Sequence, residues 1–192
     1  GILKTYSIFI GEFYFGLALL WMLLILAGFV VLKGRVFTLI KRIKDPILLA
    51  FSTSSSEAAF PKTMMELERF GCKDKIVSFV LPLGYSFNLD GSMMYMTFAS
   101  IFIAQSFGIH LDIATQVSML LVLMLTSKGI AGVPRASLVV IAGTLATFNI
   151  PEAGIALLLG IDPLLDMGRS ATNVVGNSVA TAVVSKWEGE LE

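Results

Sequence analysis

Residues 162–177 read DPLLDMGRSATNVVGN and place charged side chains inside an apolar stretch, residues 153–186. Charged groups at membrane depth are costly and usually line a substrate or ion path. An Asp–Arg pair that only ties helices together is the alternative, but five polar positions exceed what such a tie requires. Their spacing of four, three, four and four residues predicts one stripe along a helix: Asp162, Asp166, Arg169, Asn173 and Asn177.

The composition of the whole chain favours a membrane protein. Of its 192 residues, 56% are hydrophobic and 15% are charged, and the mean hydropathy is +0.84. Soluble domains contain about 45–50% apolar and about 25% charged residues, so a lipid bilayer is the expected environment. The formal net charge is zero and no basic patch is present, which argues against nucleic acid as a partner. The single cysteine, Cys72, excludes a disulfide framework and a Cys/His metal cluster, and we expect no cofactor.

The order of apolar stretches predicts an all-α membrane protein with two kinds of element. We expect spanning helices at 1–34, 76–108 and 153–186, the second of them broken between Gly84 and Ser92. The segments 36–70 and 114–149 each have two arms that are too short to cross a bilayer, around a small polar tip. Irregular backbone at membrane depth persists only when it is buried or lines a cavity. We therefore predict two opposed re-entrant hairpins, a pattern typical of transporters built from inverted repeats.

The basic residues predict the orientation of these elements. Lysine and arginine follow the first span, the first hairpin and the last span, whereas the loops at 109–112 and 148–152 contain neither. The positive-inside rule then places the first set in the cytoplasm. The tip at 52–57 enters from inside and the tip at 127–134 from outside, so the chain is expected to be a multi-pass protein whose tips meet near the midplane. Because the chain begins without methionine or a signal peptide and ends in a polar run, we interpret it as a fragment of a longer protein.

The polar residues indicate what such a site would bind. The fork of the Arg169 guanidinium suits a carboxylate, and the neighbouring Asp166 suits an ammonium group. A ligand with both groups is an acidic amino acid. The break near Asn88 and Asp90 would free backbone carbonyls beside one carboxylate, which favours a small hard cation over a simple glycine kink with a buried aspartate.

Other classes of protein stay open at this stage. The serine-rich tip at 52–57 could bind an anion, form a plain turn, or pair with Lys128 as in an intramembrane hydrolase. No general-acid partner or nucleophile elbow accompanies these serines, which argues against catalysis. A membrane channel is a second alternative, although it would not need two opposed tips around one zwitterion pocket.

Four motifs together resemble the dicarboxylate/amino acid:cation symporter family, which includes glutamate and aspartate transporters. They are Thr53–Ser56, Asn88–Ser92, Gly132–Pro134 and Asp166–Asn173, and the resemblance covers essentially all of the chain. Within the family the bacterial proton/glutamate carriers are most similar. The resemblance implies a C-terminal part of a transport domain, with the scaffold domain absent. It further implies a homotrimer in the full-length protein and elevator transport gated by the external hairpin.

The resemblance also implies two sets of site residues. In the first set, Asp166 would hold the substrate ammonium and Arg169 its side-chain carboxylate. The full substrate set is Ser55, Ser56, Ser92, Val133, Asp166, Arg169, Ser170 and Asn173. The cation or proton set is Glu57, Gly84, Ser86, Asn88, Asp90, Lys128, Asn173 and Asn177, with sodium at Asn88 and Asp90.

Departures from the family pattern bear on the coupling ion and the substrate. Asn177 stands where sodium-coupled members carry an acid, and the Lys128 ammonium is able to replace a second sodium ion. Glu57 replaces a serine, and a buried carboxyl with a raised pKa there would carry a proton. We therefore favour protons over sodium. Asp166 favours an acidic amino acid over a C4-dicarboxylate, which is the alternative substrate. Arg135, next to the second tip, is unusual and receives no role.

Overall fold

The computed structural model describes residues 1–128, 130 and 132–192, and the regular elements in this part of the chain are helices. The prediction of an all-α protein is thereby confirmed. One isolated β-bridge joins Cys72 to Leu191. The helices are α1 (Ile2–Leu32), α2 (Arg35–Arg42), α3 (Lys44–Thr53), α4 (Phe60–Phe70), α5 (Asp74–Phe87), α6 (Asp90–Ser106), α7 (Ile113–Thr126), α8 (Ala136–Thr147), the 3₁₀ turn η1 (Glu152–Gly154), α9 (Ile155–Leu159) and α10 (Asp162–Trp187).

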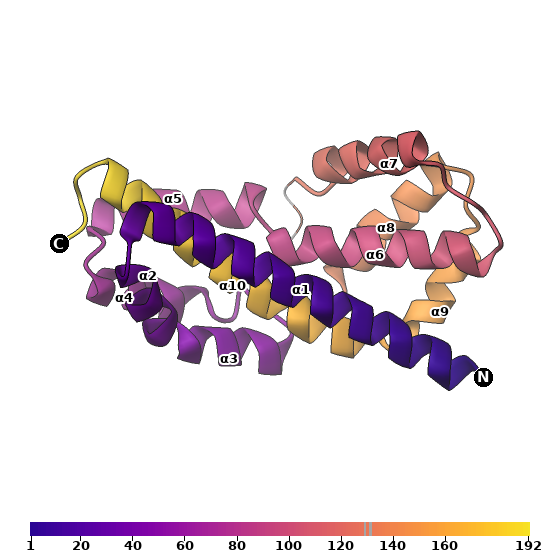
Figure 1. Ribbon diagram of the computed structural model, residues 1–192, viewed down its shortest axis with the longest axis horizontal. Helices are drawn as coiled ribbons and strands as arrows, with labels where there is room; N and C mark the ends of the chain where they lie inside the picture. Colours follow the sequence, from indigo (N-terminus) through magenta and orange to yellow (C-terminus); the bar gives the residue numbers. More distant parts are fainter. Residues whose placement is uncertain (129, 131) are drawn as a thin grey trace.

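Helix α10 is the central element of the molecule. It runs beside α1 along the long axis (Figure 1) and packs against α3, α5 and α6 as well. Helices α7, α8 and α9 gather around α6 at one end, whereas α2 and α4 lie at the other end with α5 (Figure 1). Because every larger group of helices contacts α10, the polar stripe on α10 lies where these groups meet.

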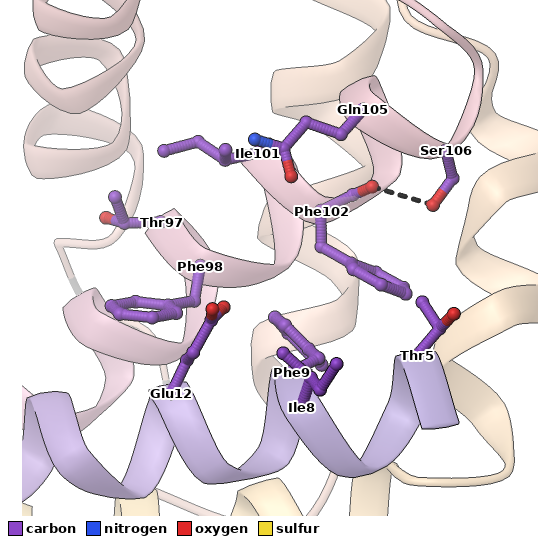
Figure 2. Close-up of a pocket in the computed structure, with 10 residues that line it drawn as sticks. All are labelled: Thr5, Ile8, Phe9, Glu12, Thr97, Phe98, Ile101, Phe102, Gln105 and Ser106. Atoms are coloured by element: carbon purple, nitrogen blue, oxygen red, sulfur yellow. Dashed lines mark hydrogen bonds between the residues drawn. The ribbon is translucent and has the colours of Figure 1, made fainter. Parts of the chain in front are cut away.

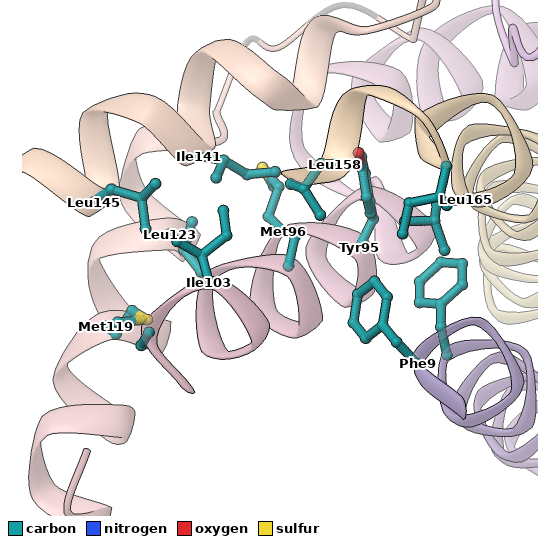
Figure 3. Packing of buried hydrophobic residues seen from close by; sticks show 14 of the residues in the cluster. Phe9, Tyr95, Met96, Ile103, Met119, Leu123, Ile141, Leu145, Leu158 and Leu165 are labelled. Atoms are coloured by element: carbon teal, nitrogen blue, oxygen red, sulfur yellow. The ribbon is translucent and has the colours of Figure 1, made fainter. Parts of the chain in front are cut away.

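Two apolar clusters flank the middle of α10. The first includes Phe13, Tyr95 and Leu165 and joins α1 and α6 to α7, α8 and α9 (Figure 3). The second includes Leu81 and Val175 and joins α2, α4 and α5 to the later half of α10. Burial of apolar side chains is the main stabilising contribution to folding. Residues 166–173 are therefore held between two packed bodies rather than on a flexible surface.

The long apolar stretches differ from continuous helices. In the described part of the chain, α1 alone is long and apolar enough to cross a bilayer, while α7 and α8 are apolar but shorter. The break in the second stretch is confined to Asn88 and Leu89, because the Asn88 N–H donates to the Gly84 carbonyl at 2.6 Å and extends α5 to Phe87. The break is therefore narrower than the predicted one, which extends from Gly84 to Ser92.

The last stretch, 153–186, is two helices rather than the single helix that we expected. Helix α9 ends at Leu159 and α10 begins at Asp162, with Pro163 in its first turn. A proline ring collides with the carbonyl four residues earlier and has no N–H to donate, so α9 cannot continue through this position. The break places Asp162 at the start of α10.

Each polar tip connects two helices that are consecutive in the sequence, α3 to α4 for the first tip and α7 to α8 for the second (Figure 1). The arm before the first tip is itself divided into α2 and α3 at Ile43. Ser54 directly follows α3 and Arg135 directly precedes α8, and both residues adopt left-handed backbone angles, with φ of 52° and 63°. Such angles are uncommon for residues other than glycine, so the backbone turns sharply at these two residues.

The lone cysteine lies between α4 and α5 and is buried against the last residues of the chain. Burial raises the pKa of the Cys72 thiol above its ordinary value, partly offset by a hydrogen bond to Ser185 and by the charge of Arg35. The thiol form is therefore favoured, as in other buried structural cysteines.

Candidate functional site

Arg169 lies at the centre of the polar cluster, and its side chain is 0% exposed. Its Nε donates to Asp166 Oδ1 at 2.6 Å, and Nη1 donates to the Ser92 hydroxyl at 3.2 Å. Nη2 donates to the carbonyls of Ser54 at 3.3 Å and Val133 at 3.1 Å. One guanidinium thus joins α10 to α6 and to both tips.

Asp166 uses both of its carboxylate oxygens. Besides the bond from Arg169, Oδ2 accepts the backbone N–H of Arg135 at 2.7 Å. A buried ion pair is tolerated when its remaining hydrogen-bonding positions are also satisfied. The pair therefore combines one positive and one negative charge in a fixed geometry, next to the second tip.

Asn173 organises the start of α6. Its side-chain oxygen accepts the backbone N–H groups of Gly91 at 2.9 Å and Ser92 at 3.2 Å. Its amide nitrogen donates to the Ser92 hydroxyl at 3.2 Å and lies 3.5 Å from the Ser56 hydroxyl. The first N–H groups of a helix have no partner inside the helix, so Asn173 caps α6 from α10 and sets the position of Ser92.

The two tips contact each other directly above this cluster. The Ser55 hydroxyl donates to the Gly132 carbonyl at 3.1 Å, and the Gly132 N–H donates to the Glu57 carboxylate at 2.9 Å. Tyr85 supports the first tip by donating to the Ser56 carbonyl at 2.8 Å. A Cβ at Gly132 would overlap the Ser56 hydroxyl, so glycine is required for the tips to approach this closely.

The prediction that the Glu57 side chain is buried is wrong. Its side chain is exposed, because it reaches across the rim of the contact to the Gly132 N–H rather than into the cluster.

The amino-acid sequence that forms this cluster also matches the model of a known family. The model of the sodium:dicarboxylate symporter family matches residues 1–187.

The chain belongs to that family.

Its curated relatives carry two different names. A proton/sodium-glutamate symport protein of Geobacillus stearothermophilus is 55% identical over 167 residues, which cover 86% of this chain and 40% of the relative. One of the same name in Bacillus subtilis is 48% identical, over 90% of this chain and 41% of the relative. A C4-dicarboxylate transport protein of Agrobacterium fabrum is 48% identical, over 97% of this chain and 42% of the relative.

The chain thus spans about two-fifths of the length of these relatives. The family resemblance inferred from the four motifs is confirmed. Because the family consists of symporters, an intramembrane hydrolase is not supported.

Part of the expected cation-binding set forms a second group beside Arg169. Asn88 donates from Nδ2 to Asn177 Oδ1 at 3.2 Å. A Cβ at Gly84 would lie 2.5 Å from Asn177 Oδ1, and one at Gly176 would overlap the Asp90 carboxylate. Because both positions are glycine, the residues around the α5–α6 break can pack directly against α10.

Besides Glu57, two other members of that set have surroundings of their own. The Lys128 ammonium donates to the Phe87 carbonyl at 2.9 Å, at the end of α5. Ser86 is exposed and donates to the Pro82 carbonyl in its own helix, so the structure does not bring it into the group. Within the described residues, no three acidic, histidine or cysteine side chains come together to hold a metal.

Three residues make contacts in the cluster that the sequence did not predict. The Tyr95 hydroxyl donates to the buried carboxylate of Asp162, and Arg135 lies 3.6 Å from that carboxylate. The Ser54 carbonyl, rather than a serine hydroxyl, contacts Arg169 from the first tip. Tyr95 follows Ser92 by three residues and shares its helical face, a signal that could have identified it.

A groove of about 490 Å³ lies apart from this cluster, between α1 and α6. Figure 2 shows Phe9, Phe98 and Phe102 along its walls, and the Glu12 side chain extending from α1 toward Phe98. Glu12 is the one charged side chain among the residues that line the groove, so the groove lacks the paired charges that a zwitterion requires. The Arg169 cluster is therefore the better candidate for a substrate site.

Proposed function

We propose that this chain forms the substrate-binding part of a symporter for acidic amino acids, glutamate or aspartate. The observation that carries this proposal is the buried Arg169–Asp166 pair, on which both tips converge. A guanidinium binds a carboxylate through parallel hydrogen bonds, and a carboxylate beside it binds an ammonium group. C4-dicarboxylate symport is the alternative, since relatives of both names are similar to the chain.

Substrate would bind by replacing contacts within the cluster. Arg169 Nη2 donates to the carbonyls of Ser54 and Val133, and a substrate carboxylate is a stronger acceptor than either. The buried Ser170 hydroxyl has no hydrogen-bond partner among the described residues, which suits it to the α-carboxylate beside Asn173. Ser55, Ser56 and the Val133 backbone would close over the ligand from the tips. Movement of the second tip would then open and close the site.

The membrane arrangement follows from the same proposal. Residues 36–70 and 114–149 would be re-entrant hairpins in inverted repeats, and 1–34, 76–108 and 153–186 would cross the bilayer. Exposed apolar side chains along α1, among them Phe15, Leu23 and Leu26, support a lipid or protein environment for that helix. The remaining length of the full protein would provide the scaffold of a homotrimer, against which this unit moves as an elevator.

Protons are the proposed coupling ion, in preference to sodium. The Lys128 ammonium on the Phe87 carbonyl occupies a place that a cation could take. Asn177 contributes a neutral amide rather than a carboxylate beside Asn88. Glu57 is the proposed proton carrier, because its carboxylate accepts the Gly132 N–H and so joins the two tips although it is exposed. Asp90 with Asn88 is the remaining candidate for sodium.

Replacing Lys128 with alanine is expected to make uptake depend on sodium. Loss of the ammonium leaves the Phe87 carbonyl beside Asp90 without its cation, and sodium would take that place. The measurement is the initial rate of glutamate uptake with and without a sodium gradient, with an expected stimulation of about threefold or more. Lys41→Ala, at an exposed position on α2, is the control. A sodium response equal to that of the wild type would contradict the assignment.

The proposed function is tested with the full-length protein in proteoliposomes. An inward proton gradient without sodium is expected to drive accumulation of labelled glutamate, and an uncoupler should abolish it. Unlabelled aspartate should compete more strongly than succinate, because succinate has no ammonium for Asp166. Accumulation of succinate but not glutamate would instead support the C4-dicarboxylate alternative. Uptake of neither substrate under proton or sodium gradients would reject both.

A further inference from the structure

Arg135 is held at the end of the second tip by its backbone. It adopts a left-handed φ of 63°, and its N–H donates to Asp166 Oδ2 at 2.7 Å. Its side chain is 64% exposed, and the guanidinium Nε lies 3.6 Å from Asp162 Oδ2. The strained backbone and the bond to Asp166 together direct this side chain toward the start of α10.

Asp162 is the buried partner in this contact, with a side chain that is 1% exposed. One oxygen accepts the Tyr95 hydroxyl, whereas Oδ2 has no hydrogen bond in the described part of the chain. An isolated buried carboxylate is strongly unfavourable, and a nearby cation relieves most of that penalty. The Arg135 guanidinium is within ion-pair distance of the unsatisfied oxygen.

Asp162, Asp166, Arg169 and Arg135 form one connected group of charges, and this group is neutral only when Arg135 is counted. Asp162 and Asp166 contribute two negative charges and Arg169 one positive charge, so these three sum to −1. Arg135 brings the sum to zero. Glutamate and C4-dicarboxylates both carry a net negative charge, and electrostatic repulsion is strong where solvent screening is weak.

We propose that Arg135 is a specificity-determining residue that neutralises Asp162, so that the site accepts a negatively charged substrate. This inference rests on the proposed function, in that it assumes an anionic ligand beside Arg169. Arg135 acts on that ligand through the field of the ion pair rather than by direct contact. The Asp162 charge, left alone, would repel the ligand.

Kinetics of the full-length protein test this role through charge rescue. Arg135→Gln, which removes the charge but keeps a polar side chain, is expected to raise the KM for substrate about tenfold. Arg135→Lys should stay within about twofold of the wild type, because it retains the charge. The double variant Arg135→Gln with Asp162→Asn restores neutrality, and its KM should return to within about threefold of the wild type. A merely structural role for Arg135 would not be rescued by removing a second charge.

The control is Arg42→Gln, which removes an exposed guanidinium on α2 and should leave the KM unchanged. An unchanged KM in Arg135→Gln, or a double variant no better than the single one, would overturn the inference. The series uses whichever of glutamate and succinate the wild type accumulates, because both are anions. Failure of wild-type glutamate uptake with intact succinate uptake bears only on the proposed substrate. Uptake of neither anion would overturn both proposals.

Discussion

Replacing Arg169 with alanine is expected to lower uptake of glutamate by the full-length protein at least about a hundredfold. The change removes the proposed carboxylate-binding group and leaves Asp166 as a buried charge without its partner. It also removes the hydrogen bonds that Arg169 donates to the carbonyls of Ser54 and Val133. Breaking a buried pair costs about 3–5 kcal/mol of stability, and a loss of that size in substrate binding corresponds to a factor of about 10²–10⁴ in affinity.

The chain contains a matched control for this experiment. Arg69 pairs with Glu66 at 2.8 Å with the same spacing of three residues, but its side chain is 61% exposed. The Glu66 side chain is 12% exposed, but this pair lies on α4, outside the Arg169 cluster, so Arg69→Ala should transport nearly as well as the wild type. Uptake is measured in proteoliposomes with equal amounts of reconstituted protein. Transport by Arg169→Ala at the wild-type rate would exclude a role for the guanidinium in substrate binding.

Replacing Gly91 with alanine is expected to lower stability by about 1–3 kcal/mol and to disrupt the site as well. Helix α6 crosses α10 at this glycine, and an added Cβ would overlap the Arg169 carbonyl and lie 2.9 Å from the Thr172 Cβ. Both neighbours belong to the body of α10, so neither can rotate away as a flexible side chain would. Separation of the helices would weaken the bonds from Gly91 and Ser92 to Asn173.

Thermal unfolding of the purified full-length protein measures this effect. Gly143→Ala is the control, since Gly143 lies within α8 and nothing comes within 4 Å of an added Cβ there. Alanine is favoured over glycine in a helix by about 0.5–1 kcal/mol, so the control should keep or slightly raise the melting temperature. Equal melting temperatures for the two variants would show that α6 and α10 are not in close contact at Gly91.

Local spacing was sufficient to predict the ion pair at the centre of the polar cluster. Asp166 and Arg169 are three residues apart on α10, and side chains with that spacing meet on one helical face whatever the surrounding fold. The structure pairs them at 2.6 Å. Apolar periodicity likewise predicts the helical class, and small polar, glycine and proline residues predict the two polar connections. Both signals depend on only a few neighbouring residues.

Contacts between distant segments could not be predicted in the same way. Arg169 meets Ser54 across 115 positions of sequence, and which backbone groups face it depends on how two tips close together. Glu57 is exposed for the same reason, because the position of Gly132 draws its carboxylate to the rim.

The amino-acid sequence alone therefore established the helical class, the family and the Asp166–Arg169 pair. The partners of that pair, the location of Asp162 beside Tyr95 and Arg135, and the break at Asn88 and Leu89 emerged from packing around α10. The physical reason is the range of the forces involved. Helical periodicity relates neighbours along one chain segment, whereas burial and charge compensation are properties of all the segments that surround a residue.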